Sequence, residues 1–80
     1  MSDAYDKWVG NQLKHYRLKN NLTLEEVGLK IGRSKKQVQN YEIGESRLYL
    51  PLLIELCRIY DIDYRKLINE SISYLESEEL

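Results

Sequence analysis

The sequence contains very little cysteine and histidine. Cys57 is its single cysteine, so no internal disulfide bond can form, as is usual for intracellular proteins. His15 is its single histidine and is expected at the surface, and one residue of each type is too few for a metal site. The composition therefore predicts a protein without a metal ion or another cofactor.

Long apolar runs are absent as well. The longest, residues 48–54, contains Pro51 and is too short to cross a membrane. The first seven residues include two acids and no apolar run, which is unlike a signal peptide. We therefore expect a cytoplasmic protein that does not enter a membrane.

Motifs of catalysis and of β-sheets are missing from the 80 residues too. We find no Ser/His/Asp arrangement, no pair of carboxylates typical of an acid–base site and no glycine-rich phosphate loop. We also find no alternation of β-branched residues and no Asn-Gly or Asp-Gly turn. These absences favour an all-α protein that is not an enzyme.

The charges are distributed unevenly along the chain. Residues 1–47 contain nine Lys and Arg against six Asp and Glu, a net charge of +3. Residues 48–80 contain three against seven, a net charge of −4. The overall charge of −1 therefore conceals a basic half, which can bind a polyanion while the acidic half faces away from it.

Helix-end signals and apolar periodicity predict five helices. The first covers about residues 4–19 and ends at the pair Asn20-Asn21. Pro51 suits the first turn of the fourth, and Asp63 is a suitable cap for a fifth that reaches Ile68. The second and third each begin with a capping box and end at a glycine; the boxes are Thr23 with Glu26 and Ser34 with Gln37, and the glycines are Gly32 and Gly44.

Two segments of the chain together form a specific pattern. Residues 22–44 read LTLEEVGLKIGRSKKQVQNYEIG, and residues 52–68 read LLIELCRIYDIDYRKLI. Over about residues 8–68 this pattern resembles the Cro/cI-type repressors, also called the XRE family. The resemblance implies a five-helix repressor-like domain in which the second and third helices form a helix-turn-helix that binds double-stranded DNA.

The resemblance also implies roles for single residues. Arg17 and Glu42 occupy positions where the family often has an ion pair between the first and third helices. Leu24 stands where members commonly have a glutamine that contacts a phosphate, so that contact is not expected here. Gly28 stands where the family prefers alanine, at a close crossing of the second and third helices, and Asp61 replaces a common glycine.

The third helix has the chemistry of a DNA-reading element. Its exposed face is expected to contain long basic or amide side chains and no acid, and such side chains pair with base edges in the major groove. We expect base contacts from Lys35, Lys36, Gln39 and Asn40. We expect contacts to the DNA backbone from Thr23, Arg33, Ser34, Gln37 and Arg47.

The C-terminal tail leaves two arrangements open. We divide the chain into a DNA-binding domain of residues 1–68 and a tail of residues 69–80. Ile68, Ile72 and Leu75 recur at helical spacing, so the fifth helix can extend to about Leu75. This apolar stripe would either form the contact of a homodimer or pack back on the first helix, near Trp8 and Leu13.

Two functions follow from these observations. The first is a transcriptional regulator, a repressor, that reads a pseudo-palindromic operator as a dimer. The alternative is an antitoxin or an adaptor that uses the same fold mainly to bind a protein. The acidic end of the tail, with Glu76, Glu78 and Glu79, favours this alternative.

Overall fold

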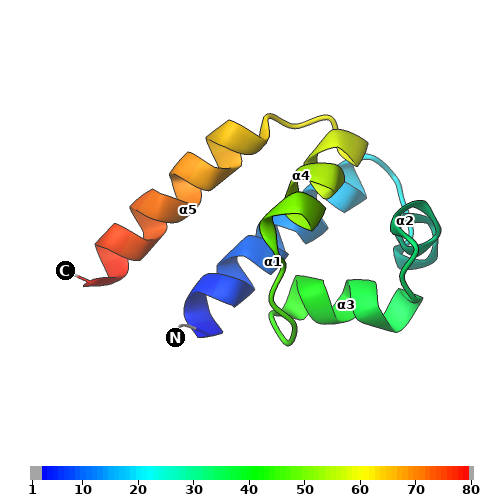
Figure 1. Cartoon of the computed structure of the whole chain (residues 1–80), viewed down its shortest axis with the longest axis horizontal. Helices are drawn as coiled ribbons and strands as arrows, with labels where there is room; N and C mark the ends of the chain where they lie inside the picture. The colour runs from blue at the N-terminus through cyan, green and yellow to red at the C-terminus, as the bar shows by residue number, and fades with distance from the viewer. Residues whose placement is uncertain (1–2, 80) are drawn as a thin grey trace.

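A computed structural model describes residues 3–79 of the chain, and their side chains over residues 4–77. The side chains of Glu78 and Glu79, expected at the acidic end of the tail, lie outside the described part. Within that part the chain forms five helices and no strand (Figure 1). The helices are α1 (Asp3–Lys19), α2 (Leu24–Ile31), α3 (Lys35–Ile43), α4 (Leu50–Ile59) and α5 (Tyr64–Glu79).

The capping signals lie where the sequence predicts them. Thr23 Oγ1 accepts a hydrogen bond from the Glu26 N–H at 3.0 Å, and Glu26 Oε1 accepts one from the Thr23 N–H at 2.8 Å. Ser34 Oγ accepts a bond from the Gln37 N–H at 3.0 Å, and this is the one bond of the second box that the described residues form. The first box is therefore complete and the second is half formed.

The remaining helix ends depend on backbone conformation. Gly32 and Gly44 follow α2 and α3 at φ values of 69° and 84°, the left-handed region that glycine adopts without strain. Asn21 and Asp61 adopt φ values of 56° and 57° after α1 and α4. The conformation of Asp61 explains why a glycine is common at this position.

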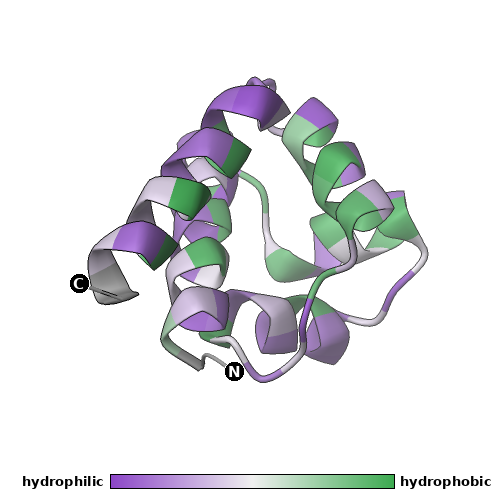
Figure 2. Cartoon of the chain, turned by 60° about the vertical axis from the view of Figure 1, so that its left-hand side comes forward, coloured by the Kyte–Doolittle hydropathy of each residue, from purple (hydrophilic) through white to green (hydrophobic). Residues whose placement is uncertain are grey.

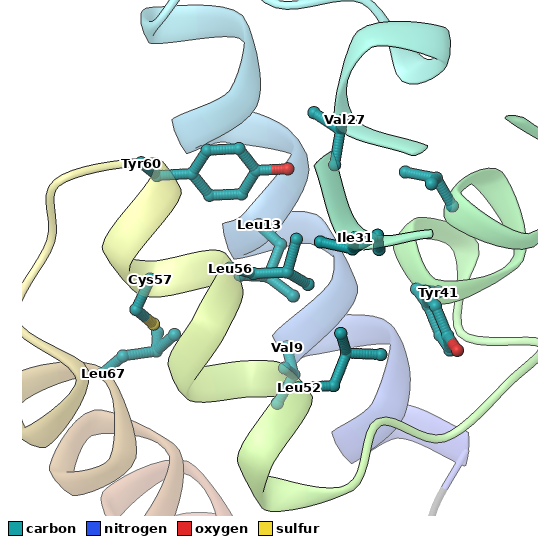
Figure 3. Packing of buried hydrophobic residues seen from close by; sticks show 11 residues of the cluster. Val9, Leu13, Val27, Ile31, Tyr41, Leu52, Leu56, Cys57, Tyr60 and Leu67 are labelled. Carbon is teal, nitrogen blue, oxygen red and sulfur yellow. The ribbon is translucent and has the colours of Figure 1, made fainter. Parts of the chain in front are cut away.

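The core lies between α1 and α4, and it is completed by residues of α2, α3 and α5 (Figure 3). Leu13 of α1, Val27 of α2 and Cys57 of α4 are its most completely buried side chains. Helices α2, α3 and α4 have 8, 9 and 10 residues and are too short to be stable alone, so this shared burial stabilises them. The other core residues are Val9, Ile31, Val38, Tyr41, Leu52, Leu56, Tyr60 and Leu67.

Cys57 gives a prediction about alkaline pH. Burial, together with the negative charge of Asp63, raises the pKa of its thiol from 9.0 to about 11. The thiol in the unfolded chain therefore loses its proton first, so the unfolding free energy should fall as the pH rises from about 9 to 11. Urea denaturation at several pH values across this range should show a smaller fall in the unfolding free energy for Cys57→Ala than for the wild type. An equal dependence of the unfolding free energy on pH in the two proteins would contradict the prediction.

The C-terminal half of α5 packs back on α1, which is one of the two arrangements left open by the sequence (Figure 1). The rings of Trp8 and Tyr74 stack with their centroids 5.4 Å apart. The Tyr5 hydroxyl donates to Ser71 Oγ at 3.2 Å. The Ser71 hydroxyl in turn donates to the Ile68 carbonyl at 2.7 Å. Stacking of the two half-buried aromatic rings and pairing of the buried Ser71 hydroxyl therefore hold the tail on α1.

The side of α5 that packs on α1 differs from the expected apolar stripe. Leu67 and Ser71 are buried, whereas Ile72 keeps 47% of its surface exposed. Hydrophobic and hydrophilic bands alternate along α5 in Figure 2, as in an amphipathic helix. The helix continues without a break past residue 68 and ends at Glu79, beyond the expected end near Leu75.

Candidate nucleic-acid interface

The position of α3 is set by α1, and two glycines allow the contact. A Cβ atom on Gly10 would collide with the carbonyl oxygen of Tyr41 and lie 2.5 Å from that of Glu42. A Cβ atom on Gly44 would lie 2.7 Å from Lys7 Cγ and 2.9 Å from the Lys7 nitrogen. The C-terminal end of α3 therefore rests directly on the backbone of α1, which fixes the direction of α3.

An ion pair between Arg17 and Glu42 joins the same two helices. Arg17 Nε and Nη2 donate to the two carboxylate oxygens of Glu42 at 2.7 and 3.1 Å. Arg17 Nη1 donates to the Leu22 carbonyl at 2.9 Å, so the guanidinium also fastens the start of the α1–α2 connection. Both residues are 7% exposed. The pair therefore supports α3 from inside and does not face the solvent.

The turn between α2 and α3 is as close as the sequence suggests. The Arg33 N–H donates to the Gly28 carbonyl at 2.9 Å. A Cβ atom on Gly28 would lie 2.5 Å from the Arg33 carbonyl oxygen. The alanine that the family prefers would therefore press on the backbone of the turn in this chain.

The outward face of α3 carries the residues expected to contact bases. Lys35, Lys36 and Gln39 are exposed and Asn40 is half-buried, while Val38 faces the core. Glu42 is the only acid in the sequence of α3, and its burial leaves the exposed face without negative charge. The N-terminus of α3 adds the partial positive charge of its free N–H groups, so the face attracts an anion.

Ile43 extends this face, although it was not assigned a contact from the sequence. It lies four residues after Gln39, on the same stripe of the helix, and it is 49% exposed. An apolar side chain at this place suits the methyl group of thymine in the major groove. The stripe spacing is the sequence signal that could have identified it.

The residues expected to contact the DNA backbone lie in separate groups. Thr23 and Lys35 line one shallow hollow of about 560 Å³ between the starts of α2 and α3. Leu24 lines the same hollow and packs partly against the core. Ser34 is exposed at the start of α3 and Gln37 is half-buried one turn later. These residues surround the N-terminal end of α3.

Arg33 lies in the turn, beside two tyrosine rings. A hydrogen bond with Tyr41, and then weaker interactions with Tyr49, raise the pKa of its guanidinium above the ordinary value. An arginine guanidinium is charged at physiological pH in any case, as a phosphate contact requires. Tyr49 is 59% exposed and had no assigned role, because its approach to Arg33 depends on the path of the α3–α4 connection.

Arg47 lies apart from that group, in the connection between α3 and α4. Its Nε and Nη2 donate to the two carboxylate oxygens of Asp6, each at 3.2 Å. The Arg47 side chain is 65% exposed and that of Asp6 is 13% exposed. Asp6 could not be identified from the sequence, because 41 positions separate the two residues.

The described residues were also compared with what a metal site and a membrane span require. No group of three metal-ligating side chains comes together among the residues that the structure describes. None of the described helices combines the length and the apolar character that a membrane span requires.

Comparison with known proteins gives one match. A family model described as a helix-turn-helix domain matches residues 8–68, which include α2, α3 and α4 completely. No curated protein and no solved structure matches the chain significantly. The matched residues agree with the resemblance to Cro/cI-type regulators, and this domain implies DNA as the partner. The chain therefore belongs to the helix-turn-helix domain family.

Proposed function

We infer that this protein is a sequence-specific regulator of transcription that reads double-stranded DNA by placing α3 in the major groove. The observation that carries this proposal is the exposed, acid-free face of α3, held rigidly on α1 beside the helix α2. A repressor is the form that we favour, because occupation of an operator needs nothing beyond this face. In this account the protein acts in the cytoplasm and catalyses no reaction.

Different residues contact the bases and the phosphates. Lys35, Lys36, Gln39 and Asn40 read bases, since lysine donates to guanine and the amides pair with adenine. The phosphate contacts fix the position of α3 but carry no sequence information. With about five phosphates contacted by each monomer, each monomer should contribute about −4 to −5 to the slope of the logarithm of the affinity against the logarithm of the salt concentration. The phosphate contacts are Thr23, Arg33, Ser34, Gln37 and Arg47.

Truncation of either of two side chains on α3 should weaken binding to the operator. We expect Lys36→Ala and Asn40→Ala each to lower the affinity about tenfold to a hundredfold, the cost of losing one base contact. Gel shifts with DNA upstream of the protein's own gene measure this effect. Lys66→Ala removes an exposed lysine of α5 and should bind as the wild type does. Unchanged affinity in both α3 variants would contradict the proposal.

A dimer follows from the size of the reading helix. One helix of nine residues reads only a few base pairs, whereas a twofold dimer reads two half-sites about 34–36 Å apart. Ile72 is the residue of the apolar stripe that α1 leaves most exposed, and we place the dimer contact there. Ile68 and Leu75, which flank it along the helix, are half-buried.

The dimer contact can be tested by the mass of the protein in solution. Ile72→Glu should convert the dimer to a monomer, because it puts a charge into an apolar contact. Ser73→Glu adds the same charge at the neighbouring exposed position and should remain dimeric. A dimer that persists in Ile72→Glu would exclude this surface as the interface.

The second candidate function is binding to a protein through α5. Glu70 and Glu76 are exposed on this helix, far from α3 in Figure 1, so they could bind a basic partner without obstructing DNA. An antitoxin or adaptor of this kind would bind its partner equally well after Lys36→Ala and Asn40→Ala. Unchanged DNA affinity of both variants in the gel shifts described above would favour this second function.

A further inference from the structure

Arg47, which follows α3 and is expected to contact a phosphate, is paired with the carboxylate of Asp6 in α1. Asp6 engages Nε and Nη2 of Arg47 in a two-point ion pair with both distances at 3.2 Å. The carboxylate is mostly covered, with 13% of its side chain exposed, and the guanidinium is 65% exposed. Asp6 is therefore a fixed group at the protein surface, and Arg47 is the more accessible partner.

The place of this pair is fixed by the packing beneath it. Gly44 ends α3 directly against Lys7, the residue next to Asp6, so the α3–α4 connection starts on the first turns of α1. Asp6 and Arg47 line a small hollow of about 80 Å³ whose floor includes Val9 and Leu53. The pair thus lies beside the C-terminal end of α3, at the edge of the face that we assign to DNA.

We propose that Asp6 competes with DNA phosphate for Arg47 and thereby limits the affinity of the protein for its operator. A phosphate that reaches Arg47 meets a carboxylate already paired with the same guanidinium. The phosphate must displace or share this partner, and the two anions repel each other. With the guanidinium 65% exposed, the ion pair is open to solvent on the Arg47 side and weak enough to exchange in this way. This inference rests on the proposed function, since it assumes that Arg47 binds DNA.

The test replaces the carboxylate by the amide of the same shape. Asp6→Asn should bind the operator about twofold to fivefold more tightly than the wild type, the size of effect expected for giving up an exposed ion pair. The salt slope should become steeper by up to about one unit for each monomer, because the Asp6 carboxylate then no longer competes with phosphate for Arg47. Thermal melting should show that both proteins are folded at the temperature of the binding assay.

Two control variants separate this effect from a change in net charge. Asp61→Asn changes the charge equally but lies in the α4–α5 connection, distant from α3 in Figure 1, and should bind as the wild type does. In the Arg47→Ala background, Asp6→Asn should have no effect on affinity, because the competition needs both residues. A gain that persists in this background would overturn the proposal.

The remaining outcomes are also decisive. Unchanged or weaker binding by Asp6→Asn overturns the competition, and weaker binding would show that Asp6 positions Arg47 for phosphate. Either result leaves the proposed function intact provided that Lys36→Ala and Asn40→Ala still weaken binding. Failure of the wild type to bind any DNA specifically would overturn the proposed function and this inference together.

Discussion

Replacement of Arg17 by alanine is expected to lower the unfolding free energy by about 3–5 kcal/mol. The side chain is buried, and its removal leaves the Glu42 carboxylate without the two donors at 2.7 and 3.1 Å that compensate its burial. A domain of 80 residues has a total stability of roughly 4–12 kcal/mol. Urea denaturation followed by circular dichroism should therefore show a variant close to the limit of folding.

A double variant tests whether the unpaired charge is the cause. Arg17→Met combined with Glu42→Leu removes both charges and fills the space with apolar groups, so it should recover most of the lost stability. If the double variant is as unstable as Arg17→Ala, the loss comes from packing or from the bond to the Leu22 carbonyl. A loss below about 1 kcal/mol in Arg17→Ala, the size typical of an exposed pair, would contradict the buried arrangement.

Replacement of Gly10 by alanine should also destabilise the protein, by about 1–3 kcal/mol. An alanine at an open helical position normally stabilises a helix by about 1 kcal/mol relative to glycine. Here its Cβ would meet the carbonyl oxygens of Tyr41 and Glu42, which are backbone atoms and cannot rotate away. The contact should push α3 off α1, so DNA affinity should fall together with stability.

A control variant at the adjacent position separates the close contact at Gly10 from the general effect of alanine in a helix. Asn11→Ala changes the adjacent, exposed residue of α1 and should stabilise the protein slightly or leave it unchanged. Thermal melts of the two variants give the comparison directly. A Gly10→Ala protein as stable as Asn11→Ala would show that α1 and α3 are not in close contact at Gly10.

Local signals explain what could be predicted from the sequence. Thr23, Gly32 and Gly44 act on backbone groups within a few residues, so their spacing was sufficient to place the helix ends. The outward face of α3 was predictable for the same reason, because Val38 and Tyr41 identify the opposite face. The third helix extends to Ile43 because Gly44, the glycine expected to end it, is the first residue that leaves the helical conformation.

Contacts between distant segments could not be predicted in this way. Gly10 matters because the backbone of α3 approaches it, and nothing around Gly10 in the sequence reveals that approach. Asp6 and Arg47 meet only after the α3–α4 connection has folded over α1. The position of the tail was similarly undecided, because the stacking of Trp8 on Tyr74 depends on the angle at which α5 leaves the core.

Selection of bound sites from random double-stranded DNA tests the central claim that α3 reads bases. We expect the wild type to select a pseudo-palindrome whose half-sites are one helical turn apart. Asn40→Ala should select the same sequence with the preference relaxed at one position in each half-site, because one side chain has stopped reading one base pair. Identical selected sequences for the two proteins, or no enrichment at all with the wild type, would contradict the account.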